Sequence, residues 1–239
     1  MRDLGIIYDH FPIEEREPQP EPDFEPLKID GHLYKLLETE SYSITVRAWR
    51  DDVTGLRTNT THYGLATKGH SVLRFGEQRI TVTAGMFFVL HGEARVDGLD
   101  GSGLVISVED YHGLFQLGGP IEERGRLQYI DGCTDTLLVC PPRLGEPCLN
   151  HLHIPPHTSQ TAHTHPSERI GVILRGYGEC RTPKGVYPLK PGMGWRIPTG
   201  SLHSFFTTDE SLDVIAWHPD SDFGPTDENH PMINRTIVG

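Results

Sequence analysis

The sequence has few basic residues and no long apolar run. Its 21 lysines and arginines stand against 33 aspartates and glutamates, which gives a formal net charge of −12. A nucleic-acid-binding surface needs clustered lysine and arginine, so we expect no nucleic-acid partner. No apolar stretch is long enough to span a bilayer, and the first twenty residues lack a signal-peptide pattern. We therefore expect no membrane partner and a cytoplasmic protein.

Cysteine is also scarce, and its spacing excludes the common thiol motifs. The four cysteines form no CxxC pair; they are Cys133, Cys140, Cys148 and Cys180. Because the cytosol keeps thiols reduced, we expect small hydrophobic side chains here rather than disulfide partners or metal ligands.

Glycine and proline, in contrast, are plentiful. The 239 residues include 26 glycines and 19 prolines, and 36% of the residues are hydrophobic. This composition favours many short strands and turns around a substantial core over long helices. The length fits one large or two small domains.

Three histidines form the most informative pattern. His163 and His165 are separated by one residue, and His203 follows in a later segment. Side chains two apart on a strand point to the same face, so both imidazoles of the His-x-His pair can reach one ion. A third histidine from another strand would complete a metal site.

Turn residues precede the third histidine at a regular spacing. Gly192 is followed after five residues by Pro198, after one more by Gly200, and after two more by His203. This spacing is typical of a strand, a tight bend and a strand that re-enters a small barrel. Together with the His-x-His pair, the pattern resembles the two motifs of the cupin superfamily. The resemblance implies an all-β fold of double-stranded β-helix, or jelly-roll, barrels.

The resemblance is incomplete at the acidic position of the first motif. Cupins have a metal-binding glutamate there, after three residues that follow the second histidine, but this chain has Arg169. His157 stands in place of the first motif glycine, whereas Gly176 fits the second. Two alternatives follow: a local bulge brings Glu168 onto the metal, or the site has three histidines with Arg169 beside it.

The chain resembles a duplication, because VLRFGE at 72–77 matches ILRGYGE at 173–179. We therefore predict two tandem cupin barrels, of which only the second binds metal. The predicted parts are an acidic, proline-rich extended arm (1–28), a degenerate barrel (29–115), a connector (116–132), a metal-binding barrel (133–220) and a tail (221–239).

The first half lacks the complete ligand set. The repeat places His62 opposite His163 and Gly64 opposite His165, and it offers only Arg95 or Val96 near the position of His203. We therefore interpret the histidines of the first half as ordinary polar or core residues.

Further polar residues surround the predicted site. His151 and His153 alternate on one strand face, so they either line the pocket or form a solvent-facing pair. Tyr177 and Arg181 are candidates for the pocket rim.

The implied functions are several, since cupins include dioxygenases, decarboxylases, lyases, isomerases and binding proteins. We predict a metal-dependent enzyme, foremost a non-haem Fe(II) oxygenase or dioxygenase of a small anionic substrate held by Arg169. The alternatives are a lyase, decarboxylase or isomerase, with Glu168 or Tyr177 as acid or base, and a non-catalytic binding or sensor protein. Three neutral nitrogens suit Fe(II), and also Mn, Ni, Zn or Cu. Assembly as a homo-oligomer stays open.

Overall fold

The computed structural model describes residues 23–28, 33–38, 43–233 and 236–239. These residues form β-strands and one 3-10 turn, η1 (Ile130–Gly132), and they contain no α-helix, so the chain is all-β as predicted. None of them builds a helix that could cross a membrane. Residues 1–22, most of the predicted arm, lie outside the described residues.

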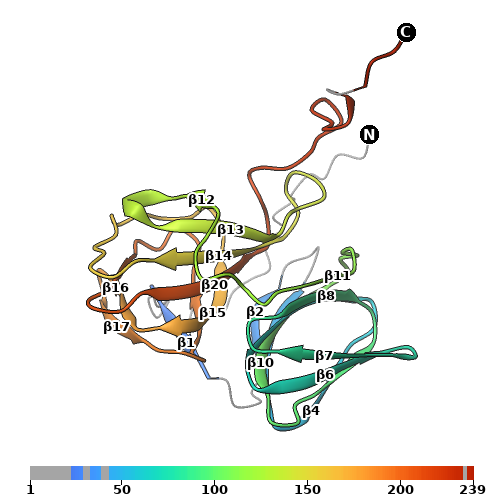
Figure 1. The fold of residues 1–239 in the computed structure, drawn as a ribbon, viewed down its shortest axis with the longest axis horizontal. Helices are drawn as coiled ribbons and strands as arrows, with labels where there is room; N and C mark the ends of the chain where they lie inside the picture. Colours follow the sequence, from blue (N-terminus) through green and yellow to red (C-terminus); the bar gives the residue numbers. More distant parts are fainter. Residues whose placement is uncertain (1–22, 29–32, 39–42, 234–235) are drawn as a thin grey trace, which may run out of the picture.

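The first half of the chain forms two antiparallel sheets (Figure 1). The larger has the strand order β11-β8-β5-β10-β3-β2, and the smaller has the order β4-β9-β6-β7. Their bounds are β2 (Leu33–Glu38), β3 (Ser43–Arg50), β4 (Val53–Leu56), β5 (Thr60–Lys68), β6 (His70–Phe75), β7 (Gln78–Thr83), β8 (Phe87–His91), β9 (Ala94–Asp97), β10 (Ser102–Glu109) and β11 (Gln116–Gly118).

The second half repeats this arrangement, with a large sheet ordered β1-β18-β15-β20-β14-β13-β12 and a small one ordered β17-β16-β19. Their bounds are β1 (Glu25–Leu27), β12 (Leu127–Gln128), β13 (Thr134–Val139), β14 (Cys148–Ile154), β15 (Arg169–Gly176), β16 (Gly178–Thr182), β17 (Gly185–Leu189), β18 (Gly194–Ile197), β19 (Ser204–Phe206) and β20 (Leu212–His218).

Strand β1 crosses from the start of the chain to the second half. It pairs antiparallel with β18, and the preceding residue, Phe24, is 1% exposed, with its ring 4.9 Å from that of Tyr187 on β17. The segment is acidic and contains proline, yet it extends the large sheet by one edge strand, where a proline is tolerated.

The central strands of both large sheets are buried over most of their length. In β5 seven consecutive residues are buried, and in β20 every residue except Ala216 is buried. Such continuous runs are typical of strands covered on both faces. One face of each strand packs inside its own half, and the other face packs against the other half.

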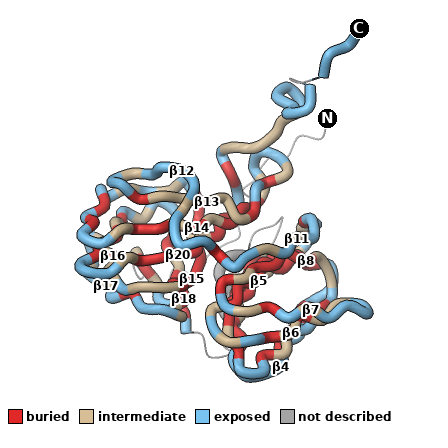
Figure 2. Tube along the Cα trace, in the orientation of Figure 1, coloured by how far each residue is buried: buried red, intermediate tan, exposed pale blue. Residues whose placement is uncertain are grey.

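A shared hydrophobic core joins the two halves. The ring of Tyr63 on β5 lies 5.7 Å from that of Trp217 on β20, and both side chains are buried. Figure 2 shows the buried strands β5, β15 and β20 where the halves meet. Separating the halves would expose this apolar surface to water, so they pack as one unit.

Candidate metal centre

Three histidines meet where two loops of the second half lie side by side. His163 and His165 lie between β14 and β15, and His203 lies directly before β19. His163 and His203 form an isolated antiparallel bridge, so the His-x-His pair does not lie on a regular strand as its alternation predicted. One nitrogen from each imidazole lies within 4.8 Å of the other two, a separation that one ion can span.

Backbone carbonyls orient two of these imidazoles. Nδ1 of His163 lies 2.9 Å from the carbonyl oxygen of Thr161, and Nδ1 of His203 lies 2.9 Å from that of Ser201. Because a carbonyl oxygen only accepts, each Nδ1 carries the proton and donates it. Each Nε2 therefore keeps its lone pair, as metal-bound histidines do when a carbonyl holds their other nitrogen.

The surroundings also favour the neutral form of two of the imidazoles, those of His165 and His203. Burial, together with Arg169 and the neighbouring histidines, lowers the pKa of His165 to about 3. Burial chiefly lowers the pKa of His203 to about 4. A neutral imidazole is the form that binds a metal ion, so the residues present fit a divalent transition metal.

The structure does not bring Glu168 to this group. Its two carboxylate oxygens accept hydrogen bonds from Nε and Nη2 of Arg196, at 2.6 and 2.9 Å, and the residue is only 7% exposed. Arg196 also contacts Glu25 of β1, at 3.2 Å. Strand alternation turns Arg196 away from the cavity that its neighbours Trp195 and Ile197 line, so Glu168 lies on the outer side of the sheet.

Arg169 has the opposite orientation and lines the same cavity as the three histidines. Its hydrogen bonds to the described residues all come from Nη1, to the backbone oxygens of Ser167 and Glu168 and to Oγ of Ser167. Nε and Nη2 thus make none within this part of the chain. Burial lowers the pKa of Arg169, although Asp220 and Asp222 oppose that effect. The guanidinium is therefore desolvated and has no salt-bridge partner among the described residues.

The cavity has a volume of about 390 Å³ and is lined by both apolar and polar side chains. The apolar lining consists of Leu127, Leu152, Trp195, Ile197, Phe205, Val214, Ala216 and Phe223. Besides the histidine triad and Arg169, the polar lining consists of Gln128, Tyr129, Asp135, Asn150, His218 and Asp222. A mostly apolar cavity with a few convergent polar groups is the usual form of a small-molecule site.

Two residues predicted near the rim lie elsewhere. Tyr177 is 56% exposed and lines a separate surface hollow beside Glu179. Arg181 pairs with Glu179 at 2.9 Å, and its guanidinium lies 3.6 Å from the ring centre of Phe206. Neither side chain lines the cavity of the triad.

His151 and His153 neither line this cavity nor face solvent. Both are buried, and both contact Oδ1 of Asp213, at 2.7 and 3.0 Å, while Nε of Arg175 binds Oδ2 at 3.0 Å. Nη2 of Arg175 also donates to the backbone oxygen of Glu122 in the connector, at 2.6 Å. The cluster therefore ties the connector to the large sheet.

In the first half a packed core occupies the interior. A Cβ atom built on Gly64 would lie 2.0 Å from the ring of Phe88, so this ring fills the space where the repeat would place a second histidine. His62 is buried and contacts Ser107 at 2.8 Å and the backbone oxygen of Arg57 at 3.0 Å. Arg95 pairs with Asp97. Among the described residues, only the triad of the second half forms a histidine-containing ligand cluster.

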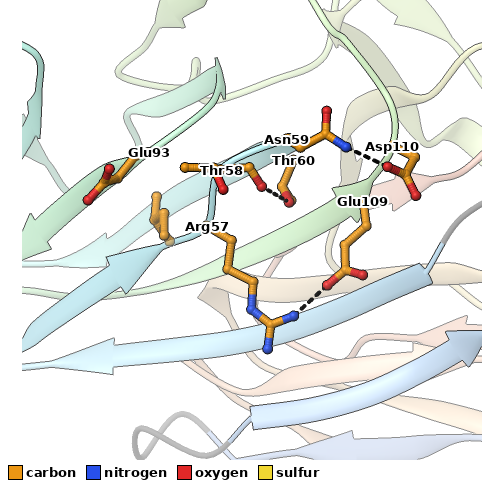
Figure 3. A pocket seen from close by; sticks show the side chains of 8 residues that line it. Arg57, Thr58, Asn59, Thr60, Glu93, Glu109 and Asp110 are labelled. Carbon is orange, nitrogen blue, oxygen red and sulfur yellow. Dashed lines mark hydrogen bonds and ion pairs between the residues drawn. The ribbon is translucent and has the colours of Figure 1, made fainter.

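A hollow of about 480 Å³ also opens on the surface of the first half, but it contains no histidine. Figure 3 shows that its polar side chains pair with one another: Arg57 binds Glu109 at 2.6 Å, and Asn59 binds Asp110 at 2.5 Å. Glu93 stands apart from these pairs. We assign no chemistry to this hollow.

Sequence reasoning missed several residues that line the cavity, notably Tyr129, Asp135, Asn150 and His218. They come from four different segments, and none belongs to a motif. The alternation of β14 could have placed Asn150 and Leu152 on one face, but it could not say which face turns inward.

The comparisons with known proteins agree with this architecture. Residues 150–218 match the family model of the cupin domain, whereas no curated protein matches the sequence. A cupin 2 conserved barrel domain protein from Leptotrichia buccalis has a similar structure, with a TM-score of 0.58 and 14% identity over 79% of this chain and 88% of that chain.

Two further solved structures are similar. Protein Ylba from E. coli has a TM-score of 0.58 and 16% identity, over 85% of this chain and 93% of that chain. A variant of salicylate 1,2-dioxygenase from Pseudoaminobacter salicylatoxidans has a TM-score of 0.56 and 8% identity, over 75% of this chain and 70% of that chain. At these identities the likeness shows the fold alone. Residues 150–218 are thus similar to a cupin domain, and the likeness in fold extends over most of the chain.

Proposed function

We propose that this protein is a two-barrel, metal-dependent cupin enzyme whose second barrel binds the metal and a small anionic organic substrate. The ligands are His163, His165 and His203, and the reaction class is that of a non-haem Fe(II) oxygenase or dioxygenase. One observation carries the proposal: the guanidinium of Arg169, which forms no salt bridge with the part of the chain that the structure describes, lines the same cavity as the three imidazoles. The first barrel is a structural partner.

The metal is the first element of the proposal. Three neutral nitrogens without a carboxylate leave open positions on a six-coordinate ion, and Fe(II) suits them; Mn, Ni, Zn and Cu are the alternatives. A bound Fe(II) with open positions supplies redox chemistry with dioxygen and holds a chelating substrate.

The substrate is the second element. The guanidinium of Arg169 is half-buried and forms no salt bridge with the described residues, and a carboxylate could accept two parallel hydrogen bonds from its Nε and Nη2. The planar fork of arginine fits a carboxylate, and its position beside the triad directs the same anion toward the metal. Trp195 and Phe205 on the apolar wall exclude water around the body of the substrate.

The dioxygenase assignment draws on one further observation. One of the similar structures is a salicylate 1,2-dioxygenase in complex with gentisate, a small organic acid, at 8% identity. This likeness supports the class of ligand by analogy and leaves the reaction to experiment.

A lyase, decarboxylase or isomerase is the second candidate. This candidate is favoured because the cavity is lined by three groups that can transfer protons, Tyr129, Asp135 and His218. Such an enzyme would turn over without oxygen.

Oxygen consumption separates these functions. The protein is loaded anaerobically with Fe(II), mixed with a panel of small carboxylic acids, and followed with an oxygen electrode. We expect oxygen uptake with at least one acid, and none after His163→Ala; the exposed variant His70→Ala serves as the control. Substrate loss in anaerobic buffer would favour the second candidate. An absence of turnover with the whole panel under both conditions would contradict the catalytic proposal.

A further inference from the structure

A hydrogen-bonded polar strip runs along the cavity wall away from Arg169. Nδ2 of Asn150 donates to Oδ1 of Asp135 at 2.9 Å, and Sγ of Cys148 lies 3.6 Å from Oδ1 of Asn150 and 2.6 Å from Nε2 of His218. Because a carboxylate oxygen accepts, the NH2 group of Asn150 is the end of the amide that is turned toward Asp135. The strip therefore ends in a carboxyl group that lines the cavity.

The charge of Asp135 has no partner in this part of the protein. No ion pair among the described residues involves this carboxyl group, and its only side-chain hydrogen bond comes from the neutral amide of Asn150. Burial raises the pKa of Asp135, which this hydrogen bond opposes. An uncompensated carboxylate in a cavity is a binding position for a cation or a hydrogen-bond donor.

Arg169 and Asp135 lie at separate places on the same inner wall. Arg169 is on β15 and Asp135 is on β13, with β20 and β14 between them in the sheet. Three steps between strands amount to roughly 14 Å across the sheet, since neighbouring strands are about 4.8 Å apart. The register also sets Asp135 level with Ile173 of β15, four residues along the strand from Arg169. Both side chains reach into one cavity, so a ligand that touches both must carry its polar groups several ångströms apart.

Apolar side chains line the cavity beside this polar strip. Along β20 the cavity is lined by Ala216 and Val214, and along β14 it is lined by Leu152 beyond Asn150. The rings of Trp195 and Phe205, 6.4 Å apart, complete this part of the lining. The cavity thus carries the cation of Arg169, with Asp222 also in its lining, an apolar part, and the carboxyl group of Asp135.

We infer that the substrate is a zwitterion, with a carboxylate at Arg169 and the metal, an apolar body, and an ammonium group at Asp135. The inference rests on the proposed function, because it takes the Arg169 end as the site of the substrate anion. Asp135 is then the residue that determines specificity, and Asn150 is the positioning residue that holds its carboxylate. An α-amino acid is too short, because its two charges are adjacent.

Three matched ligands test this assignment. We would measure the binding of 4-methylbenzoate, 4-(hydroxymethyl)benzoate and 4-(aminomethyl)benzoate to the Zn(II)-loaded full-length protein by titration calorimetry. The three share a carboxylate and a ring, and they differ only in the group at the far end. Zn(II) has no redox chemistry, so the readout is binding alone.

We expect the affinity to be highest for 4-(aminomethyl)benzoate, lower for 4-(hydroxymethyl)benzoate and lowest for 4-methylbenzoate. The first should bind about tenfold or more tightly than the last, as for a charge-assisted hydrogen bond. Asp135→Asn should reduce this ratio to about threefold or less and leave the affinity for 4-methylbenzoate unchanged. Asp209→Asn, an exposed carboxylate on the surface of the same half, is the matched control and should leave the ratio unchanged. Arg169→Gln should weaken all three ligands.

Each other result overturns a defined part of the account. Equal affinities for the three ligands would overturn the inference, and so would an affinity ratio that Asp135→Asn leaves unchanged. In either case, binding that Arg169→Gln weakens would still support the proposed anion site. If the hydroxymethyl and aminomethyl ligands bind equally well, Asp135 accepts a hydrogen bond from a neutral donor. This result would overturn the inference that the substrate is a zwitterion. If none of the ligands binds, the anion site proposed at Arg169 fails, and the inference fails with it.

Discussion

His163 and His203 are joined by two reciprocal backbone hydrogen bonds, from N of His163 to O of His203 at 2.9 Å and from N of His203 to O of His163 at 3.0 Å. This bridge places two of the imidazoles side by side, with their ring centres 4.6 Å apart. Gly200 adds a third contact, because its N–H donates to the carbonyl oxygen of His165 at 2.9 Å. Its φ of +72° lies in the left-handed region that glycine adopts without strain. The backbone thus preorganises the triad.

Arg169→Lys tests the proposed anion site. Lysine keeps the charge but loses the planar fork, so the affinity for a small carboxylate should fall by about 1–3 kcal/mol. Metal content should not change, since Arg169 is not a ligand. Titration calorimetry with 4-methylbenzoate and elemental analysis measure the two quantities. Unchanged affinity would remove Arg169 from the anion site.

Glu168→Gln separates the two alternatives for the acidic position. Because Glu168 is held by Arg196, the variant should keep its metal and lose stability, by about 1–3 kcal/mol, as expected when a buried charged hydrogen-bond partner is removed. Glu179→Gln, which removes the half-exposed pair with Arg181, is the control and should cost less than about 1 kcal/mol. Loss of the metal at unchanged stability would instead make Glu168 a fourth ligand.

Phe88→Ala tests the structural role of the first half. Phe88 is 1% exposed and packs against Gly64, so removing the ring should cost about 3–5 kcal/mol of unfolding free energy. The metal content at ambient temperature should stay the same, because the ligands all lie in the second half. Denaturant unfolding and elemental analysis check both parts. A cost below about 1 kcal/mol would contradict a packed interior.

The stability of the metal-free protein should fall on acidification. Burial lowers the pKa of His203 and of His218 to about 4, from 6.5. The unfolded chain binds these protons below about pH 6.5, whereas the folded protein binds them only near pH 4. Each histidine therefore lowers the unfolding free energy by up to about 1.4 kcal/mol per pH unit in that window.

His218→Gln isolates one of these contributions. The dependence on pH between 6.5 and 4.5 should become shallower in His218→Gln and should stay as in the wild type in the exposed variant His70→Gln. Denaturant unfolding of the chelator-treated protein at several pH values gives the slopes. Stability that rises on acidification through this window would contradict the buried, neutral state of these histidines.

The sequence predicted the parts of the site that depend on local spacing. The His-x-His pair and the spacing from Gly192 to His203 identified all three histidines that the structure brings together. Counting from His165 left two alternatives, because adjacent residues on a strand point to opposite faces and only one of Glu168 and Arg169 can turn inward. Of the two, Arg169 lines the cavity of the triad.

The parts that depend on non-local pairing could not be predicted. Asp135 and Arg169 line one cavity only because four strands align in register, which no single segment encodes. The crossing of β1 to β18 joins residues about 170 positions apart in the chain, as the pair Glu25 and Arg196 shows. Tyr177 follows Gly176, where a φ of +76° ends β15 and leads the chain into a turn, so this tyrosine lies outside the cavity.

Elemental analysis of the purified chain tests the central claim most directly. We expect about one transition-metal ion per chain in the wild type and in His62→Ala, and about none in His163→Ala, because the ligand set lies in the second half alone. Circular dichroism would show that each variant is folded. A His163→Ala protein that keeps its full metal content, while His62→Ala loses it, would contradict the account.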